Sequence, residues 1–451
     1  MSATTAVQGI YTKFKFPWLC GILMCAALLA AEHHFPSEVM YDSTLNSQID
    51  SQLAGMKSSL AHEISYLFLG SLGFFWFIWH RQRLIRWRTA IPITLIAILM
   101  WCSVSIAWAQ DPMVSSKRLA AFVLMIIGAA GTAAYWPRTT IVSFISICSA
   151  VHLTIGVIGE LAAAHFTPWE AGYRFAGTLP WNQQGFCCLV LALSSLAAMD
   201  ATPRYKQIFR LLFVYGIVFL VLTKSRSSLM GLLIGLIIYF LLTRSARFHF
   251  GLVLSLGLTT MLLYLTGVTG GIWDVISRNG EGSEDLTGRI PLWKECFGFI
   301  RARPVTGYGY QDFWTSSHIY YFASELHWGV SSAHSSYIES LLMVGAVGLV
   351  LQILVLLLGF GRGIVLYKRS RNPIYALAAC LCLIYLLVGT LESIQVAILS
   401  PYSFYFFLLL LTLCMNDIQH GPDRLATAIR PTTKFSAIRV PAKPLRVCSP
   451  P

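Results

Sequence analysis

The sequence predicts an all-α integral membrane protein with about 12 transmembrane helices, cytoplasmic N and C termini, and one long, partly helical periplasmic loop. Three observations lead to this fold class. Hydrophobic residues make up 56% of the 451 residues and charged residues only 12%, whereas a soluble globular domain carries about 25% charge. Apolar runs near the roughly 20 residues needed to cross a bilayer recur along the chain. Basic residues gather in short clusters between these runs.

Twelve apolar runs have the composition of spans. They lie at about residues 16–32, 63–79, 89–107, 119–136, 139–163, 182–199, 208–223, 227–242, 249–266, 336–360, 374–391 and 397–415. The first run follows Lys13 and Lys15 as in a signal peptide, but no convincing cleavage site follows it, so we predict that it is kept as a span. These runs form one bundle over residues 1–415, and residues 416–451 form a basic cytoplasmic tail.

The basic residues orient this bundle. With the N-terminus inside, 22 of the 33 Lys and Arg residues lie in cytoplasmic segments, and shifting the frame by one helix would move the densest basic loops outside. The other 11 lie on or near the outer face: Lys57, Lys117, Arg118, Arg174, Lys224, Arg226, Arg278, Arg289, Lys294, Arg301 and Arg303. The rule that orients the bundle does not account for these outer cations, so they are candidates for function.

Two outer segments are long, at residues 33–62 and 267–335. The second mixes Gly, Pro and aromatic residues with an amphipathic stretch from Arg289 to Arg301. We therefore expect residues 267–335 to form short helices packed on the bundle and to carry function.

The charge and the cysteines exclude two other classes. The net charge of +13 arises from clusters between spans, so we expect no nucleic-acid partner. Most of the 11 Cys residues lie inside apolar runs and no CxxC pair occurs, so we expect neither disulfides nor zinc.

Arg174 and Arg226 lie near the outer ends of spans, where a guanidinium costs free energy unless a partner compensates it. A pyrophosphate would compensate both, because the arginine fork binds phosphate oxygens in pairs. Small Gly and Ser neighbours would allow a head group to approach closely. The alternative is that both arginines snorkel to the interface or pair with Glu160 or Glu170.

In the long outer loop, the stretch Thr287–Trp293 precedes a glycine-rich stretch, Arg303–Tyr310. Arg289, a helix start and the backbone N–H groups of a turn together favour anion binding. The alternative is that the Gly-x-Gly pattern marks only a turn.

His334 stands where the chain re-enters the membrane, within Ser332–Glu339. A histidine at a water-accessible interface accepts a proton near neutral pH, which suits a general base. The alternative is a helix-capping segment, with Ser335 or Ser336 as the cap and His334 in solvent.

A proton-coupled transporter is the rival class of function. His152, Glu160, Glu339 and Glu392 are ionisable residues within predicted spans or at their ends, and such residues often mark ion pathways. Their placement mostly near outer ends, and the absence of an evident pair of matching repeats with broken helices, disfavour this class.

The sequence resembles the superfamily of bacterial membrane glycosyltransferases that contains the O-antigen ligases and O-antigen polymerases. The resemblance covers most of the chain and is strongest at Thr287–Trp293, Arg303–Tyr310 and Ala333–Glu339. The supporting stretches are Trp108–Arg118, Arg174–Asn182 and Thr223–Ser228.

The resemblance implies an enzyme of the bacterial inner membrane, facing the periplasm, whose donor is a glycan on undecaprenyl pyrophosphate. It also implies that outer-loop His and Arg residues are the active groups. We accordingly expect inverting attack at the anomeric carbon, with His334 and Arg289 catalytic and with Arg174, Arg226 and Arg289 holding the pyrophosphate. Other residues of the matching stretches are expected to bind the acceptor or support the site: Tyr308, Tyr310, Tyr337, Arg303 and Arg118.

Arginine charge replaces a divalent cation in this scheme. Glu281, Glu284 and Asp285 form an alternative metal site, but a solvated acidic turn is the simpler interpretation. We therefore expect metal-independent transfer and no cofactor beyond the lipid carrier.

Three acceptors compete within this superfamily: lipid A-core in a ligase, another lipid-linked glycan in a polymerase, and a protein side chain in protein-glycosylating relatives. The short basic tail disfavours the third. A single dominant loop before His334 resembles the ligases, whereas polymerases tend to have two Arg-rich outer loops, and residues 33–62 contain no Arg. We therefore expect an O-antigen ligase of lipopolysaccharide maturation, with an O-antigen or exopolysaccharide polymerase as the alternative.

Overall fold

The structure of this chain is a computed structural model. It describes residues 17–32, 49, 60–79, 83–87, 89–170, 172–245, 284–394 and 402–417. By its internal contacts the chain divides into two units, Met1–Asn416 and Asp417–Pro451. Asp417 is the part of the second unit that is described, and the described helices all belong to the first unit.

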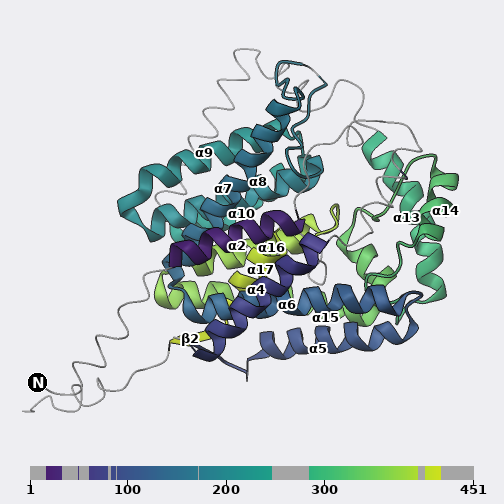
Figure 1. Ribbon diagram of the computed structural model, residues 1–451, viewed down its shortest axis with the longest axis horizontal. Coiled ribbons are helices and arrows are strands. Elements are labelled where there is room, and N and C mark those ends of the chain that lie inside the picture. The colour runs from purple at the N-terminus through teal and green to yellow at the C-terminus, as the bar shows by residue number, and fades with distance from the viewer. Residues whose placement is uncertain are drawn as a thin grey trace, which may run out of the picture. The chain divides into compact units, whose positions relative to one another are not determined.

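The described part of the chain is almost entirely helical (Figure 1). Its α-helices are α2 (Pro17–Glu32), α4 (Leu60–Trp79), α5 (Ala90–Ser105), α6 (Pro112–Tyr135), α7 (Arg138–Ala162), α8 (Trp181–Ala201), α9 (Lys206–Leu222), α10 (Arg226–Thr243), α13 (Glu284–Ala302), α14 (Ser316–Leu326), α15 (Ser336–Ser370), α16 (Pro373–Val388) and α17 (Ser403–Thr412). Two short 3-10 helices, η2 (Ile106–Trp108) and η3 (Pro203–Tyr205), and a two-stranded sheet of β1 (Arg83–Ile85) and β2 (Met415–Asp417) complete it.

Within the described residues, eight helices are long and apolar enough to cross a membrane, and three shorter apolar helices lie at Trp18–Ala31, Pro373–Val388 and Ser403–Thr412. This confirms the all-α membrane class. The predicted span at 249–266 lies outside the described residues, so the number of spans and their orientation stay predictions. The described part of the predicted outer loop contains two helices, α13 and α14, as expected of short helices in this loop.

The start of α6 differs from its predicted boundary. The apolar run begins near residue 119, but the helix begins at Pro112. Asp111 caps it by accepting a hydrogen bond from the Val114 N–H, and proline in the first turn has no N–H to leave unpaired. The polar first turns of α6 therefore extend beyond the apolar run.

The helices differ in how much they are covered by others. All ten residues of α17 are buried, and it packs against α6 and α16 in the middle of the bundle (Figure 1). α8 is also central and contacts α7, α9, α10 and α16. By contrast, only Phe209, Gly216 and Leu220 of the 17 residues of α9 are buried, as expected of a helix whose outer face meets lipid.

Helices α4 and α6 pack closely, because small residues let the two backbones meet. Gly73 on α4 faces Gly128 and Gly131 on α6, and a Cβ at Gly131 would overlap the Gly73 carbonyl. Close approach of this kind gives helices dispersion contacts in lipid, where the hydrophobic effect does not hold them together.

α15 is broken at Gly345, whose φ of 65° and ψ of −169° are not helical. The loop before α15 supplies partners there, since the N–H groups of Tyr308 and Gly309 donate to the carbonyls of Leu342 and Met343, each at 2.8 Å. A side chain at position 345 would overlap the loop backbone. The sequence predicted one continuous run at 336–360, so the break and the longer helix are corrections to that prediction.

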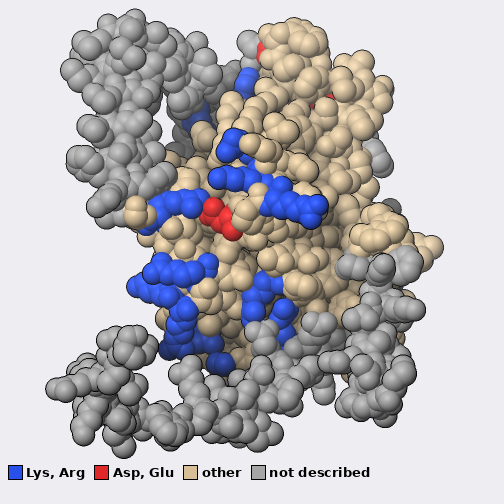
Figure 2. Space-filling view, turned by 90° about the vertical axis from the view of Figure 1, so that its left-hand side faces the viewer, with Lys and Arg blue, Asp and Glu red and all other residues tan. Residues whose placement is uncertain are grey.

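Figure 2 shows the face of the bundle opposite α13 and α14, where Lys and Arg side chains gather and acidic ones are few. Four helix ends that were predicted to be cytoplasmic carry Arg138, Lys206, Arg244 and Arg371. Arg244 pairs with Asp200 at 2.9 Å. Such a basic face is what the positive-inside rule requires of a cytoplasmic side.

Candidate active site

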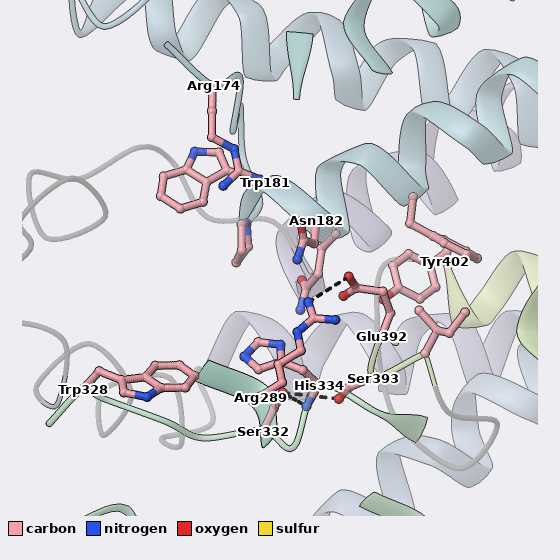
Figure 3. Close-up of a pocket in the computed structure, with 14 residues that line it drawn as sticks. Arg174, Trp181, Asn182, Arg289, Trp328, Ser332, His334, Glu392, Ser393 and Tyr402 are labelled. Carbon is pink, nitrogen blue, oxygen red and sulfur yellow. Dashed lines mark hydrogen bonds and ion pairs between the residues drawn. The ribbon is translucent and has the colours of Figure 1, made fainter. Parts of the chain in front are cut away.

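A cavity of about 440 Å³ lies where the starts of α8, α13 and α15 meet the segment between α16 and α17 (Figure 3). Its lining is mixed: Arg174, Pro180, Trp181, Asn182, Gln183, Phe186, Arg289, Trp328, Ser332, His334, Glu392, Ser393, Ile394 and Tyr402. It is large enough for a small ligand or part of a larger one. Of the predicted site residues, it joins Arg174, Arg289 and His334.

Arg289 reaches the cavity from the first turns of α13. Its Nη1 donates to the carbonyl oxygen of Leu391 at 2.7 Å, and its Nη2 lies 3.5 Å from a carboxylate oxygen of Glu392. About a fifth of the side chain stays exposed, at 19%. The guanidinium is thus oriented by one strong hydrogen bond and one longer ionic contact.

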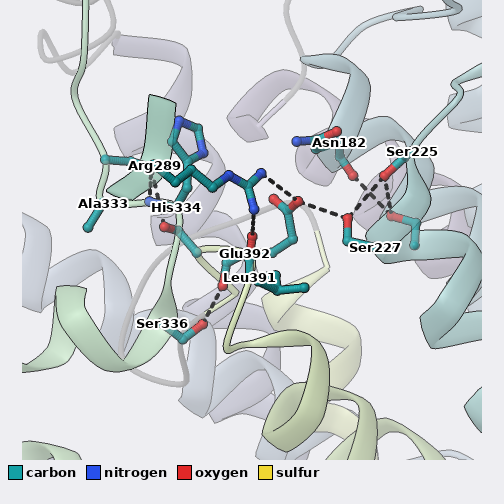
Figure 4. Close-up of polar contacts among 12 residues, drawn as sticks. Asn182, Ser225, Ser227, Arg289, Ala333, His334, Ser336, Leu391 and Glu392 are labelled. Carbon is teal, nitrogen blue, oxygen red and sulfur yellow. Dashed lines mark hydrogen bonds and ion pairs between the residues drawn. The ribbon is translucent and has the colours of Figure 1, made fainter. Parts of the chain in front are cut away.

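Glu392 follows the end of α16 and is nearly buried (Figure 4). Ser227 at the start of α10 donates to its Oε1 at 2.8 Å, and Asn182 at the start of α8 lines the same cavity. Burial raises the pKa of this carboxyl, while the hydrogen bond from Ser227 and the charge of Arg289 oppose the rise.

Arg174 lies across the cavity from Arg289 (Figure 3). Its guanidinium carbon stands 4.6 Å from the ring centroid of Trp181, and its Nε donates to the Thr223 carbonyl at 3.3 Å. A guanidinium over an indole face keeps its edge available to anions while the ring holds its plane.

The loop that carries Arg174 is held by Glu160, a fully buried residue in the last turn of α7. Its carboxylate accepts hydrogen bonds from the N–H groups of Ala176 at 2.8 Å and Gly177 at 2.7 Å, and from the Tyr173 hydroxyl at 2.6 Å. Glu160 therefore holds the Tyr173 side chain before Arg174 and the main chain after it. From the sequence, the alternatives for Glu160 were an ion partner of Arg174 or part of an ion pathway.

His334 adopts a left-handed backbone with φ of 50°, just before α15 begins. The turn is held at Ala333, whose carbonyl accepts from Trp293 Nε1 at 2.8 Å and whose N–H donates to Glu339 at 2.6 Å. The imidazole stacks near Trp328, with centroids 6.1 Å apart. His334 is thereby set at the cavity wall rather than left in a loose loop.

The side chains of this segment do not form the helix cap that the alternative interpretation of His334 requires. Ser335 is the N-cap of α15 by its backbone, but its side chain makes no cap hydrogen bond. The Ser336 hydroxyl instead donates to the Glu392 carbonyl at 2.8 Å and accepts from the Ile394 N–H at 2.9 Å. Ser336 therefore connects the start of α15 to the Glu392 segment.

Arg226 and Tyr337 are not among the residues that line the cavity. Arg226 is exposed as the first residue of α10, next to Ser227. The Tyr337 hydroxyl donates to the Leu386 carbonyl. Their predicted roles in pyrophosphate and acceptor binding remain predictions.

The other four predicted supporting residues form a separate group with Asp312, which we call the anchoring cluster: Arg118, Arg303, Tyr308, Tyr310 and Asp312. Arg118 donates to the Gln311 carbonyl. Asp312 accepts from the N–H groups of Gln110 and, at 3.1 Å, Asp111.

The two tyrosines of the anchoring cluster are also held by hydrogen bonds. Tyr310 is buried, and its N–H donates to Ser105 at 3.0 Å. The Tyr308 hydroxyl donates to the Phe299 carbonyl at 3.1 Å. The guanidinium carbon of the exposed Arg303 lies 4.8 Å from the ring centroid of Tyr308. This cluster fastens the loop after α13 to the ends of α5 and α6.

The residues that suggested a transporter are dispersed. Glu339 accepts from Trp314 Nε1 at 2.9 Å, whereas Glu160 holds the Arg174 loop and Glu392 pairs with Arg289. His152 lies in a group with Cys25 and Cys148, with its Nε2 3.4 and 3.7 Å from their sulfur atoms.

This Cys–His group has the spacing of a metal site, although His152 Nε2 also lies 3.0 Å from the Cys25 carbonyl, which favours an N–H donor there. It lines no part of the cavity. The alternative acidic metal site falls on Glu281, Glu284 and Asp285, whose side chains lie outside what the structure describes.

Sequence reasoning missed the site roles of Asn182, Trp328 and Glu392. Glu392 was noticed only as an ionisable residue at a helix end. Its partners come from distant parts of the chain, since Ser227 lies 165 residues earlier. No local spacing links them, although Asn182 does stand at the end of a stretch that resembled the superfamily.

Comparison with known proteins supports the resemblance. Residues 211–353 match the model of a family described as O-antigen ligase. Over 153 residues, 32% of this chain and 33% of the relative, the sequence is 28% identical to the exopolysaccharide production protein ExoQ of Rhizobium meliloti (strain 1021). The chain therefore spans about a third of the length of this curated relative. The family match includes Arg226, Arg289 and His334, while Arg174 lies before it.

Proposed function

We propose that this chain, whose residues 211–353 place it in the O-antigen ligase and polymerase superfamily, is a membrane glycosyltransferase that acts as an O-antigen ligase. It transfers a preassembled glycan from undecaprenyl pyrophosphate to a sugar hydroxyl of lipid A-core on the periplasmic face of the inner membrane. The observation that supports this best is the convergence of Arg174, Arg289 and His334 on one cavity at the predicted outer face.

The proposed chemistry uses these three side chains directly. His334 takes the proton of the acceptor hydroxyl, whose oxygen attacks the anomeric carbon from the face opposite the leaving group, so the configuration inverts. The bond from that carbon to the pyrophosphate oxygen breaks, and undecaprenyl pyrophosphate leaves with the electron pair. Arg174 and Arg289, with Arg226 at the start of α10, stabilise the negative charge that develops on it.

Guanidinium groups supply the charge stabilisation that a divalent cation provides in other phosphoryl-leaving reactions, so the transfer is metal-independent. Pre-orientation supports this assignment. Arg174 is stacked on Trp181 and Arg289 is bonded to Leu391, so little reorganisation is needed when charge develops.

A polymerase that uses the same donor is the second candidate. The observation in its favour is the similarity to a protein named for exopolysaccharide production. The cavity chemistry serves both reactions, because ligase and polymerase differ in the acceptor and share the leaving group. Acceptor choice is therefore the point to test.

The test is a transfer assay with the purified full chain, a polyprenyl-pyrophosphate-linked glycan, and rough lipopolysaccharide either present or omitted. A glycan ladder on lipid A-core that persists with chelator supports the proposed ligase. Glycan that lengthens on the lipid carrier without lipopolysaccharide identifies a polymerase, and loss of transfer with chelator refutes metal independence. Proton-driven substrate uptake into vesicles, with no transfer to either acceptor, would overturn the enzyme assignment in favour of the transporter.

A further inference from the structure

Among the described residues that line the cavity, Glu392 is the one carboxylate, and the proposed chemistry does not use it. It is 9% exposed, and the same cavity is lined by two arginines that are expected to bind an anion. A negative charge at such a place opposes anion binding by simple Coulomb repulsion. Its position therefore requires an explanation.

The contacts of Glu392 extend to three parts of the fold (Figure 4). The carboxylate accepts a hydrogen bond from Ser227 of α10 and pairs with Arg289 of α13. Its main-chain carbonyl accepts both the N–H of Ser336 at 3.1 Å and the Ser336 hydroxyl at 2.8 Å. One residue thus sets Arg289 relative to α10 and to the start of α15, which begins two residues after His334.

The two partners of Arg289 differ in strength. The Leu391 carbonyl lies 2.7 Å from Nη1, whereas Glu392 lies 3.5 Å from Nη2. Strong charge-assisted hydrogen bonds are about 2.7–2.9 Å long, so the contact with Glu392 is the weaker one. Ser227 at 2.8 Å holds the carboxylate in place independently of Arg289.

We propose that Glu392 is a positioning residue for Arg289 that holds the guanidinium in the empty cavity and is exchanged for a pyrophosphate oxygen when the donor binds. Nη2 changes partner from the carboxylate to the phosphate, while Nη1 keeps the Leu391 carbonyl. Ser227 retains the carboxylate beside the site. After transfer the carboxylate competes for Nη2 again and promotes release of the pyrophosphate product. This inference rests on the proposed function.

The exchange predicts opposite changes of the KM for the donor in two variants of Glu392. Glu392→Gln keeps the size and an oxygen acceptor for Ser227 but removes the competing charge. Donor and product then bind more tightly, so the KM for the donor falls and kcat falls with slower product release. Glu392→Ala also removes the contacts through which Glu392 links Arg289 to α10. It is therefore expected to raise the KM for the donor and to lower kcat.

The experiment measures transfer kinetics and, separately, binding of inorganic pyrophosphate to the purified full chain. Glu392→Gln is expected to bind pyrophosphate roughly three- to tenfold more tightly than the wild type. In the background of Arg289→Ala the same substitution is expected to change binding by less than about twofold, because the group that it positions is absent. Glu170→Gln, which removes an exposed carboxylate outside the cavity lining, is the matched control.

Unchanged or weaker pyrophosphate binding in Glu392→Gln would overturn the proposal, and so would an equal gain with and without Arg289. The binding experiment does not need transfer to occur. A protein that transfers nothing but shows the Arg289-dependent gain would refute the proposed function and leave the pairing of Glu392 with Arg289 intact. If Glu392→Ala does not fold, the isosteric Gln variant and the double variant still decide the question.

Discussion

The cavity and the anchoring cluster contain the same kinds of residue, but these residues have different roles in the two regions. Each combines arginine, a buried or nearly buried carboxylate and aromatic rings, and each was predicted on the outer face. In the anchoring cluster the polar groups end on main-chain partners, such as the Gln311 carbonyl for Arg118 and the Asp111 N–H for Asp312. By contrast, the side chains of Arg174, Arg289 and His334 line the open space of the cavity.

The difference teaches how to interpret outer-face cations in a membrane protein. A guanidinium directed at a carbonyl in a closed loop stabilises that loop, because a buried unpaired charge is costly. A guanidinium that lines a cavity and uses only some of its N–H groups for contacts within the protein can still bind an anion through the others. Substitutions in the cavity should thus change transfer, and substitutions in the anchoring cluster should change stability.

The largest expected effect is at His334. His334→Ala should lower the transfer rate by about 10²- to 10⁴-fold, since it removes the proposed general base. The control is His327→Asn, an exposed residue at the C-cap of α14 with φ of 61°, a backbone that Asn tolerates. Single-turnover transfer assays of both variants measure this, and a wild-type rate for His334→Ala would refute the assignment.

A matched arginine pair tests the comparison directly. Arg289→Ala should lower kcat/KM by roughly 10- to 100-fold, since a hydrogen bond to a charged group contributes about 1.5–3 kcal/mol. Arg303→Ala, an exposed arginine over Tyr308, should change kcat/KM by less than about twofold, because a cation–π contact at an exposed site contributes about 0.5–1 kcal/mol and serves the loop. Equal losses in steady-state assays would break the distinction between the two regions.

Glu160 tests whether a residue outside the cavity lining affects the site by positioning Arg174. Glu160→Gln should raise the KM for the donor by roughly threefold to tenfold, because its amide cannot accept from Tyr173, Ala176 and Gly177 at once. Glu170→Gln, an exposed carboxylate on the same loop, should leave KM unchanged. Donor-dependence curves together with melting curves separate a local shift of Arg174 from general unfolding.

The smallest expected effect is a pH dependence of stability at Asp312. Burial raises the pKa of Asp312 in the folded chain, so the folded state binds this proton more tightly than the unfolded state. The stabilisation is complete below the unfolded pKa of about 3.9 and is lost as the pH rises through the raised folded value.

The melting temperature of the wild type minus that of Asp312→Asn should therefore decrease from acid toward neutral pH, by roughly 2 °C or less. Thermal unfolding in detergent at several pH values measures it. A difference that grows with pH would show that Asp312 is stabilised as the carboxylate instead. Transfer activity per folded molecule should not change, which keeps this residue apart from the cavity.

Much of the fold and part of the site were accessible from the sequence. Apolar runs determine helices in a bilayer because every backbone group must be bonded within its own segment, and 11 of the 12 predicted runs correspond to described helices. Arg174 and His334 were recognisable because charged or titratable residues at span ends need a reason, and Arg289 because it lies near a helix start and a glycine-rich turn in the long outer loop. The start of α6 was misplaced because a capped polar turn has no apolar signal.

The sequence by itself determined the all-α membrane class and the residue types that a pyrophosphate site requires, because both depend on local composition and on the cost of charge in lipid. Only the tertiary structure separated Arg118 and Tyr310 from Arg289, and only it brought Glu392 to Arg289, Ser227 and Asn182. The break of α15 at Gly345 was likewise decided by the loop that packs against it. These features depend on which backbone groups meet across long stretches of chain, and pairings of that kind leave no period or spacing in one sequence.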